Sequence, residues 1–165
     1  MDRRCLAVIA FLIAVPAFAQ EPAGCDKFKW SLDRERTLLA SASATKSGDE
    51  LASKLVSPVR LALAPLADAH LPMPPERTPK SATSYAGYIR FSGAPQPGTY
   101  RITLSEDAWI DVIQGGHLVK SNASSGATGC DGLRKSVKFD LTSAPLIIQL
   151  SGVTTHDIAI VVTPD

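Results

Sequence analysis

Apolar and polar residues alternate with a period of two over much of the chain from Val59 onward. The first such run places Val59, Leu61 and Leu63 on one side of a strand and the residues between them on the other. Residues 137–141 alternate in the same way, and eight segments in all are predicted to be strands: 59–63, 85–91, 100–104, 108–113, 118–120, 137–141, 146–150 and 158–162. Most connections are short, as at the Gly-Gly turn 115–116, so neighbouring strands are expected to be antiparallel.

This series predicts an all-β fold over residues 59–165: an antiparallel β-sandwich or jelly-roll-like domain of about eight strands, with a short N-terminal helix ahead of it. A closed barrel is the alternative, because periodicity does not distinguish the two. Residues 70–77 contain three prolines and are expected to form an irregular or polyproline-like connection.

Residues 20–58 are predicted to be a lead-in to the sandwich. A helix is expected from Leu32 to about Ala42, because Ser31 is a suitable N-cap and two acidic residues lie in the first turn. Residues 41–58 are rich in Ser, Ala, Gly and Lys, which predicts a loop with room for one helical turn.

The first nineteen residues have the three parts of a secretory signal peptide. Arg3 and Arg4 form a positive start, residues 6–15 are apolar, and Ala17 and Ala19 offer small side chains for cleavage before Gln20. The apolar stretch is shorter than the roughly 20 residues that a membrane span needs, which disfavours an N-terminal anchor. The predicted location is periplasmic or extracellular, without an integral membrane anchor.

The chain has three cysteines, and Cys5 would be removed with the signal peptide. Cys25 and Cys130 then form an even pair in an oxidising compartment, which predicts one disulfide. A catalytic free thiol is the competing hypothesis, although neither cysteine has a histidine or a helix N-terminus beside it in sequence. Lipidation of Cys25 is disfavoured, because Pro22 occupies the position where a lipoprotein signal has an apolar residue.

The balance of charges argues against nucleic acid as a partner. The chain has 17 Lys and Arg against 16 Asp and Glu, and removal of Asp2, Arg3 and Arg4 leaves 15 of each. A neutral domain without a basic run offers no electrostatic footprint for nucleic acid.

The histidines are the only imidazole ligands that a metal could use: His70, His117 and His156. None forms a His-x-His or His-x3-His pair, so no metal and no cofactor is predicted, although strands can assemble ligands from distant positions. No nucleophile elbow and no phosphate-binding glycine loop occurs.

The candidate binding face lies on the strand that begins near residue 108. Asp107, Trp109 and Asp111 share one face there, with the apolar residues between them on the other. This face is interpreted either as an ordinary polar surface or as a shallow platform with Trp109 as its aromatic anchor. Paired carboxylates, including Glu106, beside an aromatic residue are also typical of glycoside hydrolysis.

Several segments together resemble a family of small secreted proteobacterial proteins of unknown function. They are Cys25 to Arg36, Leu63 to Ala67, Leu71 to Arg77, Pro97 to Tyr100, Glu106 to Val112, Gly129 and Cys130, and Lys135 to Leu141. The resemblance covers nearly the whole mature chain and implies a Gram-negative envelope setting. Some members carry the name homogentisate 1,2-dioxygenase, a jelly-roll enzyme that holds iron with two histidines and a glutamate. No motif here aligns with those ligands, so no catalytic residue is carried over.

The function predicted from the sequence is therefore a non-catalytic ligand- or partner-binding module. Its partner would be an envelope protein, a glycan or a small molecule. The alternative is a small metal-dependent enzyme with a dioxygenase-like jelly roll, which would require the three histidines to converge.

Overall fold

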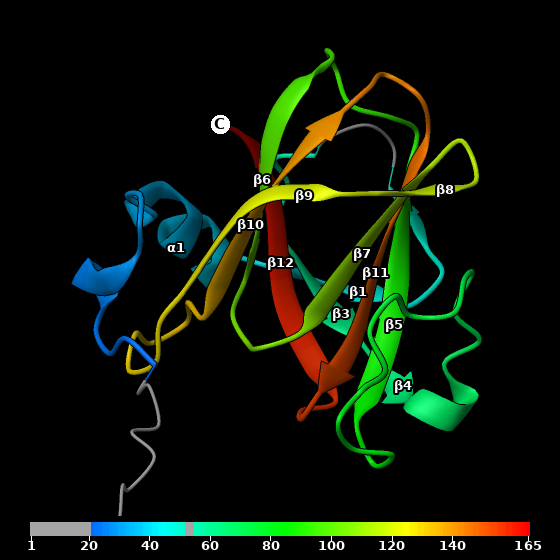
Figure 1. The fold of residues 1–165 in the computed structure, drawn as a ribbon, viewed down its shortest axis with the longest axis horizontal. Coiled ribbons are helices and arrows are strands. Elements are labelled where there is room, and N and C mark those ends of the chain that lie inside the picture. The colour runs from blue at the N-terminus through cyan, green and yellow to red at the C-terminus, as the bar shows by residue number, and fades with distance from the viewer. Residues whose placement is uncertain (1–20, 52–54) are drawn as a thin grey trace, which may run out of the picture.

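The computed structural model describes residues 21–51 and 55–165, which form twelve strands in two facing sheets (Figure 1). The strands are β1 (Ser43–Lys46), β2 (Glu50–Leu51), β3 (Val59–Ala62), β4 (Ala64–Pro65), β5 (Tyr85–Phe91), β6 (Gly98–Leu104), β7 (Trp109–Gln114), β8 (His117–Val119), β9 (Ser121–Gly126), β10 (Lys135–Leu141), β11 (Leu146–Val153) and β12 (Asp157–Pro164). Sheet I has the order β1-β3-β12-β6-β10-β9. Sheet II has the order β2-β5-β11-β7-β8, with β4 also paired to β5. The expected signal peptide lies outside the described residues.

The predicted sandwich is confirmed, and the barrel alternative is wrong because each sheet keeps its own two edges. Two details of the prediction are also wrong. The described chain has twelve strands instead of about eight, and the sheets are mixed, because β1 pairs with β3 and β2 with β5 in parallel. The additional strands are short or rich in small polar residues. They join the sheets through backbone hydrogen bonds, so side-chain alternation does not reveal them.

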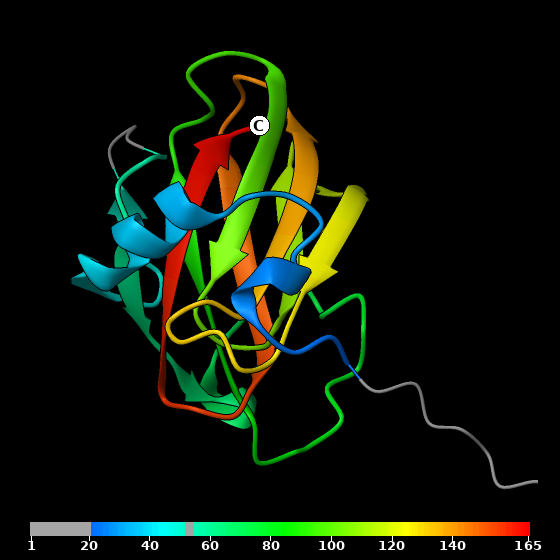
Figure 2. The ribbon, with the colours of Figure 1, turned by 90° about the vertical axis from the view of Figure 1, so that its left-hand side faces the viewer.

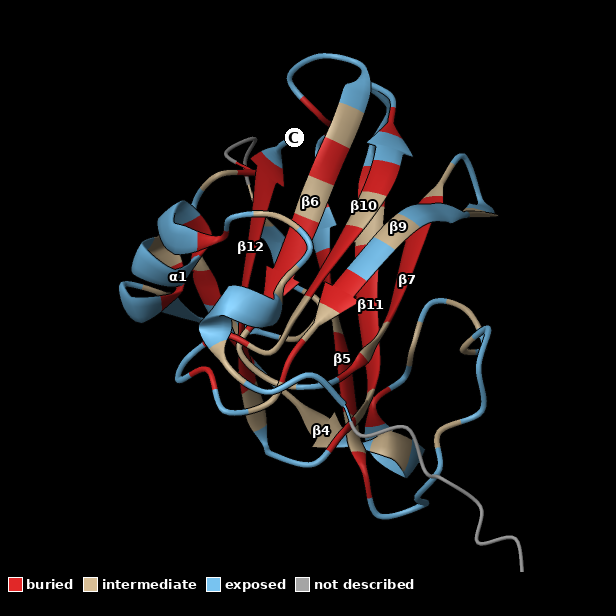
Figure 3. Cartoon of the chain, turned by 60° about the vertical axis from the view of Figure 1, so that its left-hand side comes forward, coloured by how far each residue is buried: buried red, intermediate tan, exposed pale blue. Residues whose placement is uncertain are grey.

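Between the sheets lies the main hydrophobic core (Figure 3). Every second residue of the central strands points into it: β12 contributes Ile158, Ile160 and Val162, and β11 contributes every second residue from Leu146 to Leu150. Burial of such side chains provides most of the favourable free energy of folding, roughly 1.5–3 kcal/mol for each one fully buried.

A second, smaller core lies on the outer face of sheet I. Helix α1 (Asp33–Ala40) packs there, with its buried Leu39 in the same cluster as Ala159 and Val161 of β12 (Figure 2). Strand β12 is therefore covered on both faces. The helix is confirmed, but Ser31 does not cap it, because its hydroxyl donates to the Asp33 carboxylate at 2.9 Å.

A disulfide between Cys25 and Cys130 ties the N-terminal segment to this face, across a sequence separation of 105 residues. The backbone N–H of Gly24 donates to the Thr128 carbonyl at 2.8 Å, and the Thr128 N–H donates to Pro22 at 2.9 Å. The predicted pairing is confirmed and the free-thiol hypothesis is wrong. A structural disulfide of this kind is typical of proteins in oxidising, extracytoplasmic compartments.

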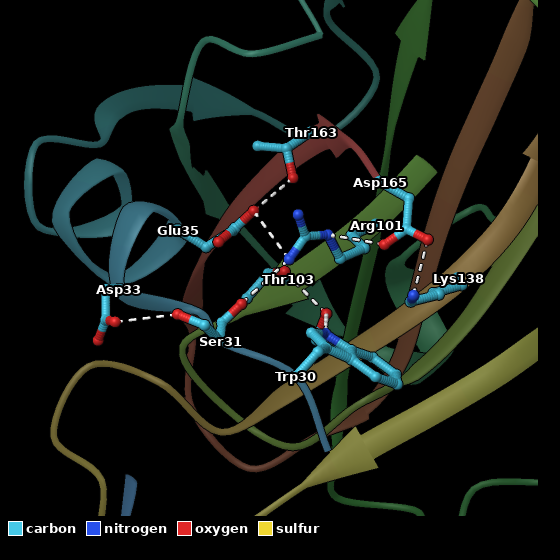
Figure 4. A network of polar contacts seen from close by, with 10 residues as sticks. Trp30, Ser31, Asp33, Glu35, Arg101, Thr103, Lys138, Thr163 and Asp165 are labelled. Carbon is cyan, nitrogen blue, oxygen red and sulfur yellow. Dashed lines mark hydrogen bonds and ion pairs between the residues drawn. The ribbon is translucent and has the colours of Figure 1, made fainter. Parts of the chain in front are cut away.

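A network of charged and polar groups also fastens α1 to sheet I (Figure 4). The carboxylate of Glu35 is buried, accepts a hydrogen bond from the Thr163 hydroxyl at 2.6 Å and lies 3.6 Å from the Arg101 guanidinium. Arg101 in turn lies 3.3 Å from Asp165, which pairs with Lys138 at 2.7 Å. A buried carboxylate is tolerable here because it has both a cation and a hydroxyl donor.

The connection from η2 (Leu66–Asp68) to β5, residues 69–84, lies over the outer face of sheet II, and we call it the cover segment. It is irregular, as its prolines predicted. Its backbone is held by two buried side chains of the sheet: the Met73 N–H donates to Gln149 at 3.2 Å and the Glu76 N–H to Asp111 at 3.4 Å.

Within residues 21–51 and 55–165, no helix has the length and apolar character that a membrane crossing requires.

Candidate functional site

A hollow of about 420 Å³ lies where the cover segment meets one end of sheet II, and we call it the Trp109 hollow. Trp109 of β7 with Ser151 and Gly152 of β11 are on its sheet side, and residues 77–81, 83 and 84 of the cover segment form one wall. Lys135 from sheet I contributes to the lining. The volume is within the roughly 300–1,000 Å³ typical of ligand pockets.

A β-bulge shapes the sheet side of this hollow. The pairing of β11 with β5 shifts between Leu150 and Val153, so that Ser151 and Gly152 together oppose the single residue Ala86. Gly152 has a φ of 75°, a left-handed conformation that favours glycine. Bulges of this kind are over-represented next to functional sites, where they redirect side chains.

Ser151 is a buried polar residue that lines the hollow. It pairs with Trp109 across β11 and β7 and therefore lies on the outer face of sheet II, beneath the cover segment. Its hydroxyl is buried and has no hydrogen-bond partner among the residues that the structure describes. A buried hydroxyl left in this way costs about 1–3 kcal/mol. Ser151 has no exposed surface, so its hydroxyl lies behind the lining of the hollow and is out of reach of a group in the hollow unless the lining shifts.

Trp109 is half-buried and held from several sides. Its indole Nε1–H donates to the Asp111 carboxylate at 2.7 Å. The Arg77 guanidinium carbon lies 5.5 Å from the ring centroid, and the Lys135 ammonium lies 5.9 Å from it. The negative face of an indole attracts such cations, which favours the position of the Arg77 guanidinium over the ring.

Asp111 connects the indole, the sheet and the cover segment. Three N–H groups of the described chain donate to its carboxylate: Trp109 Nε1, Gln149 Nε2 at 3.1 Å and the Glu76 backbone at 3.4 Å. Burial raises the pKa of Asp111 above its ordinary value, although these hydrogen bonds act in the opposite direction. The residue thus fixes the position of Trp109 and of the backbone next to Arg77.

The predicted binding face is therefore only partly an open surface. The alternation places Trp109 and Asp111 on the outer side of β7, as expected, and leaves Ile110 in the core. Asp107 is exposed and pairs with Lys135 at 3.3 Å, whereas Asp111 is buried under the cover segment. The two carboxylates have separate partners, and Trp109 borders a hollow and does not stand on a flat platform.

A second hollow, of about 280 Å³, shares Arg77, Trp109 and Lys135 with the first. Strand β8 pairs only with Val112 to Gln114 of β7, so the edge of β7 at Trp109 is not covered by β8. Apolar side chains from both sheets line this second space: Ile110, Leu118, Val119, Val137 and Phe139. Glu76, Asp111, Ser121 and Ser124 complete its lining, so the three shared residues stand between two hollows of mixed polar and apolar lining.

The three histidines are exposed and belong to different parts of the fold. His70 begins the cover segment with a φ of 44°, His117 begins β8, and His156 lies in the turn between β11 and β12, 3.3 Å from Asp157. Across residues 21–51 and 55–165, no three His, Cys, Asp or Glu side chains gather where they could hold one metal ion.

Sequence reasoning missed Arg77, Ser151 and Lys135. The predicted strand ends at Leu150, whereas β11 continues to Val153, so Ser151 and Gly152 lie beyond the prediction. The glycine within a β-rich stretch was the one local signal for the bulge. Nothing in the sequence around Lys135 indicates that it reaches a residue of the opposite sheet.

Three comparisons test whether a known protein resembles this chain. No family model, curated protein or solved structure matches it. Membership of the proteobacterial family therefore stays a prediction. The Trp109 hollow is the feature of the molecule from which a function can be inferred.

Proposed function

We propose that the protein is a non-catalytic binding module of the periplasm or cell exterior, released there by cleavage between Ala19 and Gln20. Its ligand, a small molecule or part of a glycan, would bind in the Trp109 hollow. The sequence of the first nineteen residues and the Cys25–Cys130 disulfide support export.

The observation that carries this proposal is the construction of the hollow. A bulged strand and an indole held by Asp111 form its inner side, and exposed polar groups such as the Thr154 hydroxyl line it. An aromatic side chain with a few oriented polar groups is the usual composition of a ligand pocket. The groups that hold Trp109 and the cover segment are already in place, which lowers the ordering cost of binding.

Thermal unfolding with a panel of neutral oligosaccharides, acidic oligosaccharides and small anions tests the proposal. A bound ligand raises the Tm by mass action. Thr154 is exposed and lines the hollow, so Thr154→Phe should fill part of it and remove the rise. His156→Phe, an exposed position that does not line the hollow, is the matched control and should keep the rise.

Two results would contradict this function. A Tm rise that survives Thr154→Phe would place binding elsewhere on the protein. A panel without any effect on Tm would instead favour a protein partner or a structural role in the envelope. Metal analysis of protein purified from the periplasm tests the alternative of a metal-dependent enzyme, and a stoichiometric metal would replace the present proposal.

A further inference from the structure

We infer that the Trp109 hollow recognises an oxyanion, a carboxylate or phosphate group carried by a small polar ligand, and that Arg77 is its principal donor. This inference rests on the proposed function and adds the chemical class of the ligand.

The charges around the hollow carry the first part of the argument. Three cations line it, Arg77, Lys80 and Lys135, against the single carboxylate of Asp107. Asp107 is paired with Lys135 at 3.3 Å. Within the described chain, Arg77 and Lys80 have no ion-pair partner. The lining of this hollow thus has an excess of positive charge, while the carboxylates of Glu76 and Asp111 line the adjoining hollow. Such an excess in a protein with nearly balanced charges favours a negatively charged ligand there.

Arg77 is also arranged to act as a donor. Its guanidinium lies over the Trp109 ring at 5.5 Å, and no hydrogen bond within the described residues occupies its N–H groups. The indole is anchored to Asp111, which also holds the Glu76 N–H directly before Arg77. A guanidinium held by an aromatic ring keeps its planar fork of donors for a carboxylate or phosphate, with less entropy lost on binding.

The remaining lining suits the polar body of such a ligand. Ser81 and Thr83 bring hydroxyls that bond to each other at 2.9 Å, and Thr154 adds another. The Lys135 ammonium donates to the Ala108 carbonyl and to Asp107, which leaves one of its three N–H groups for a further acceptor. Together these groups offer several donors around one oxyanion and its hydroxyl neighbours.

Isothermal titration of the mature, disulfide-bonded chain tests the inference with three probes: inorganic phosphate, a galacturonate trimer and neutral maltotriose. At least one of the two anionic probes should bind tenfold or more tightly than maltotriose, and the two anions separate phosphate from carboxylate recognition. Arg77→Gln should weaken that binding by about tenfold or more, because it removes charge-assisted hydrogen bonds. Arg77→Lys, which keeps the charge but not the fork, should restore only part of the affinity.

Arg60→Gln is the matched control, since Arg60 is an exposed arginine on β3 that pairs with Asp157 outside the hollow. It should leave affinity unchanged. Because Arg77 is exposed, Arg77→Gln should fold, and its urea midpoint checks this. If it does not fold, Lys80→Gln, at another exposed lining position, should still weaken anion binding severalfold.

The outcomes separate this inference from the proposed function. If maltotriose binds, loses binding in Thr154→Phe and is indifferent to Arg77→Gln, the binding module stands and oxyanion recognition is wrong. If the anions bind equally well to Arg77→Gln and Thr154→Phe, the binding is non-specific and the inference is overturned. If none of the three probes binds, both proposals fall.

Discussion

Asp111 shows how one buried side chain organises a surface. Its carboxylate accepts hydrogen bonds from the indole of Trp109, from Gln149 and from the cover segment. From the sequence it is one of three polar residues on an exposed face. In the folded protein it holds the indole and the backbone beside Arg77 in place, because the cover segment removes it from water.

The pKa of Asp111 leads to a pH-dependent prediction. Burial raises it above the ordinary value of 3.8, so the folded protein binds the proton more tightly than the unfolded chain. The resulting stabilisation is fully present below pH 3.8 and is lost as the pH rises through the folded-state pKa. The free energy of unfolding of wild type, minus that of Asp111→Asn, should therefore fall with rising pH over this acidic range. Urea unfolding at several pH values measures it.

Asp107→Asn, at an exposed position, controls for the loss of one negative charge in that experiment. A difference between wild type and Asp111→Asn that grows with pH would contradict the raised pKa.

Glu35 gives a second residue-scale prediction. Glu35→Ala should lower the free energy of unfolding by about 1–3 kcal/mol, because it leaves the buried Thr163 hydroxyl without its acceptor, while Arg101 keeps Asp165 at 3.3 Å. Glu35→Gln should cost less, since its amide oxygen can still accept from Thr163. Glu50→Ala, at an exposed position of β2, should stay within about 0.5 kcal/mol of wild type in urea unfolding. Equal effects of the two alanine substitutions would show that the buried pair does not stabilise the fold.

At the scale of elements, the bulge in β11 requires a left-handed residue at position 152. Gly152→Ala should cost about 1–2 kcal/mol from backbone strain alone, because the nearest atom to the added Cβ would be Pro79 Cβ at an uncrowded 3.9 Å. Gly98→Ala on β6, where an added Cβ meets nothing within 4 Å, should cost little and is the control. Thermal unfolding of both variants measures the difference. Similar Tm values would mean that β11 tolerates another conformation at the bulge.

The cover segment is the other element that determines the site. It has few half-buried side chains and attaches through the Met73 and Glu76 N–H groups, whose acceptors lie 76 and 35 residues away in sequence. These donors are backbone groups, so the apolar and polar pattern of residues 69–84 does not reveal the attachment. The shape of the Trp109 hollow follows from where these two hydrogen bonds place the cover segment.

At the scale of the whole molecule, the disulfide restricts the unfolded chain over a loop of about one hundred residues. The double variant Cys25→Ser/Cys130→Ser should lose about 2–5 kcal/mol of unfolding free energy, as expected for removal of a disulfide that closes a loop of this length. Reduced wild-type protein should have the same urea midpoint as the double variant. Identical midpoints for oxidised and reduced wild type would contradict this.

The proposed export predicts the mass and the thiol content of the mature protein. Protein recovered from the periplasm should have the mass of a chain beginning at Gln20, less two hydrogens for the disulfide, and no titratable thiol. A retained N-terminus, or two free thiols in folded protein, would contradict the predicted processing.

The sequence alone was sufficient for a β-rich domain, the helix and the cysteine pair, whereas the choice of a sandwich over a closed barrel needed the structure. Alternation such as that of Val59 and Leu61 records which face of a strand is buried, and that information is local. An even number of cysteines after a signal peptide likewise predicts a disulfide without knowledge of the fold. The edge strands β1 and β9 were not predicted, because their small polar side chains show no apolar alternation. Residues 158–162 of β12 are all apolar, as in a strand buried on both faces, but only the structure shows that α1 covers the second face.

Only the tertiary structure shows which residues form the site. Arg77, Trp109, Lys135 and Ser151 come from the cover segment, from both sheets and from a bulge, and they meet only when these elements pack. The unpartnered Ser151 hydroxyl and the buried Asp111 depend on contacts between residues far apart in sequence. The periodicity of the sequence does not predict such contacts, because a polar group is buried by a segment that is distant in sequence.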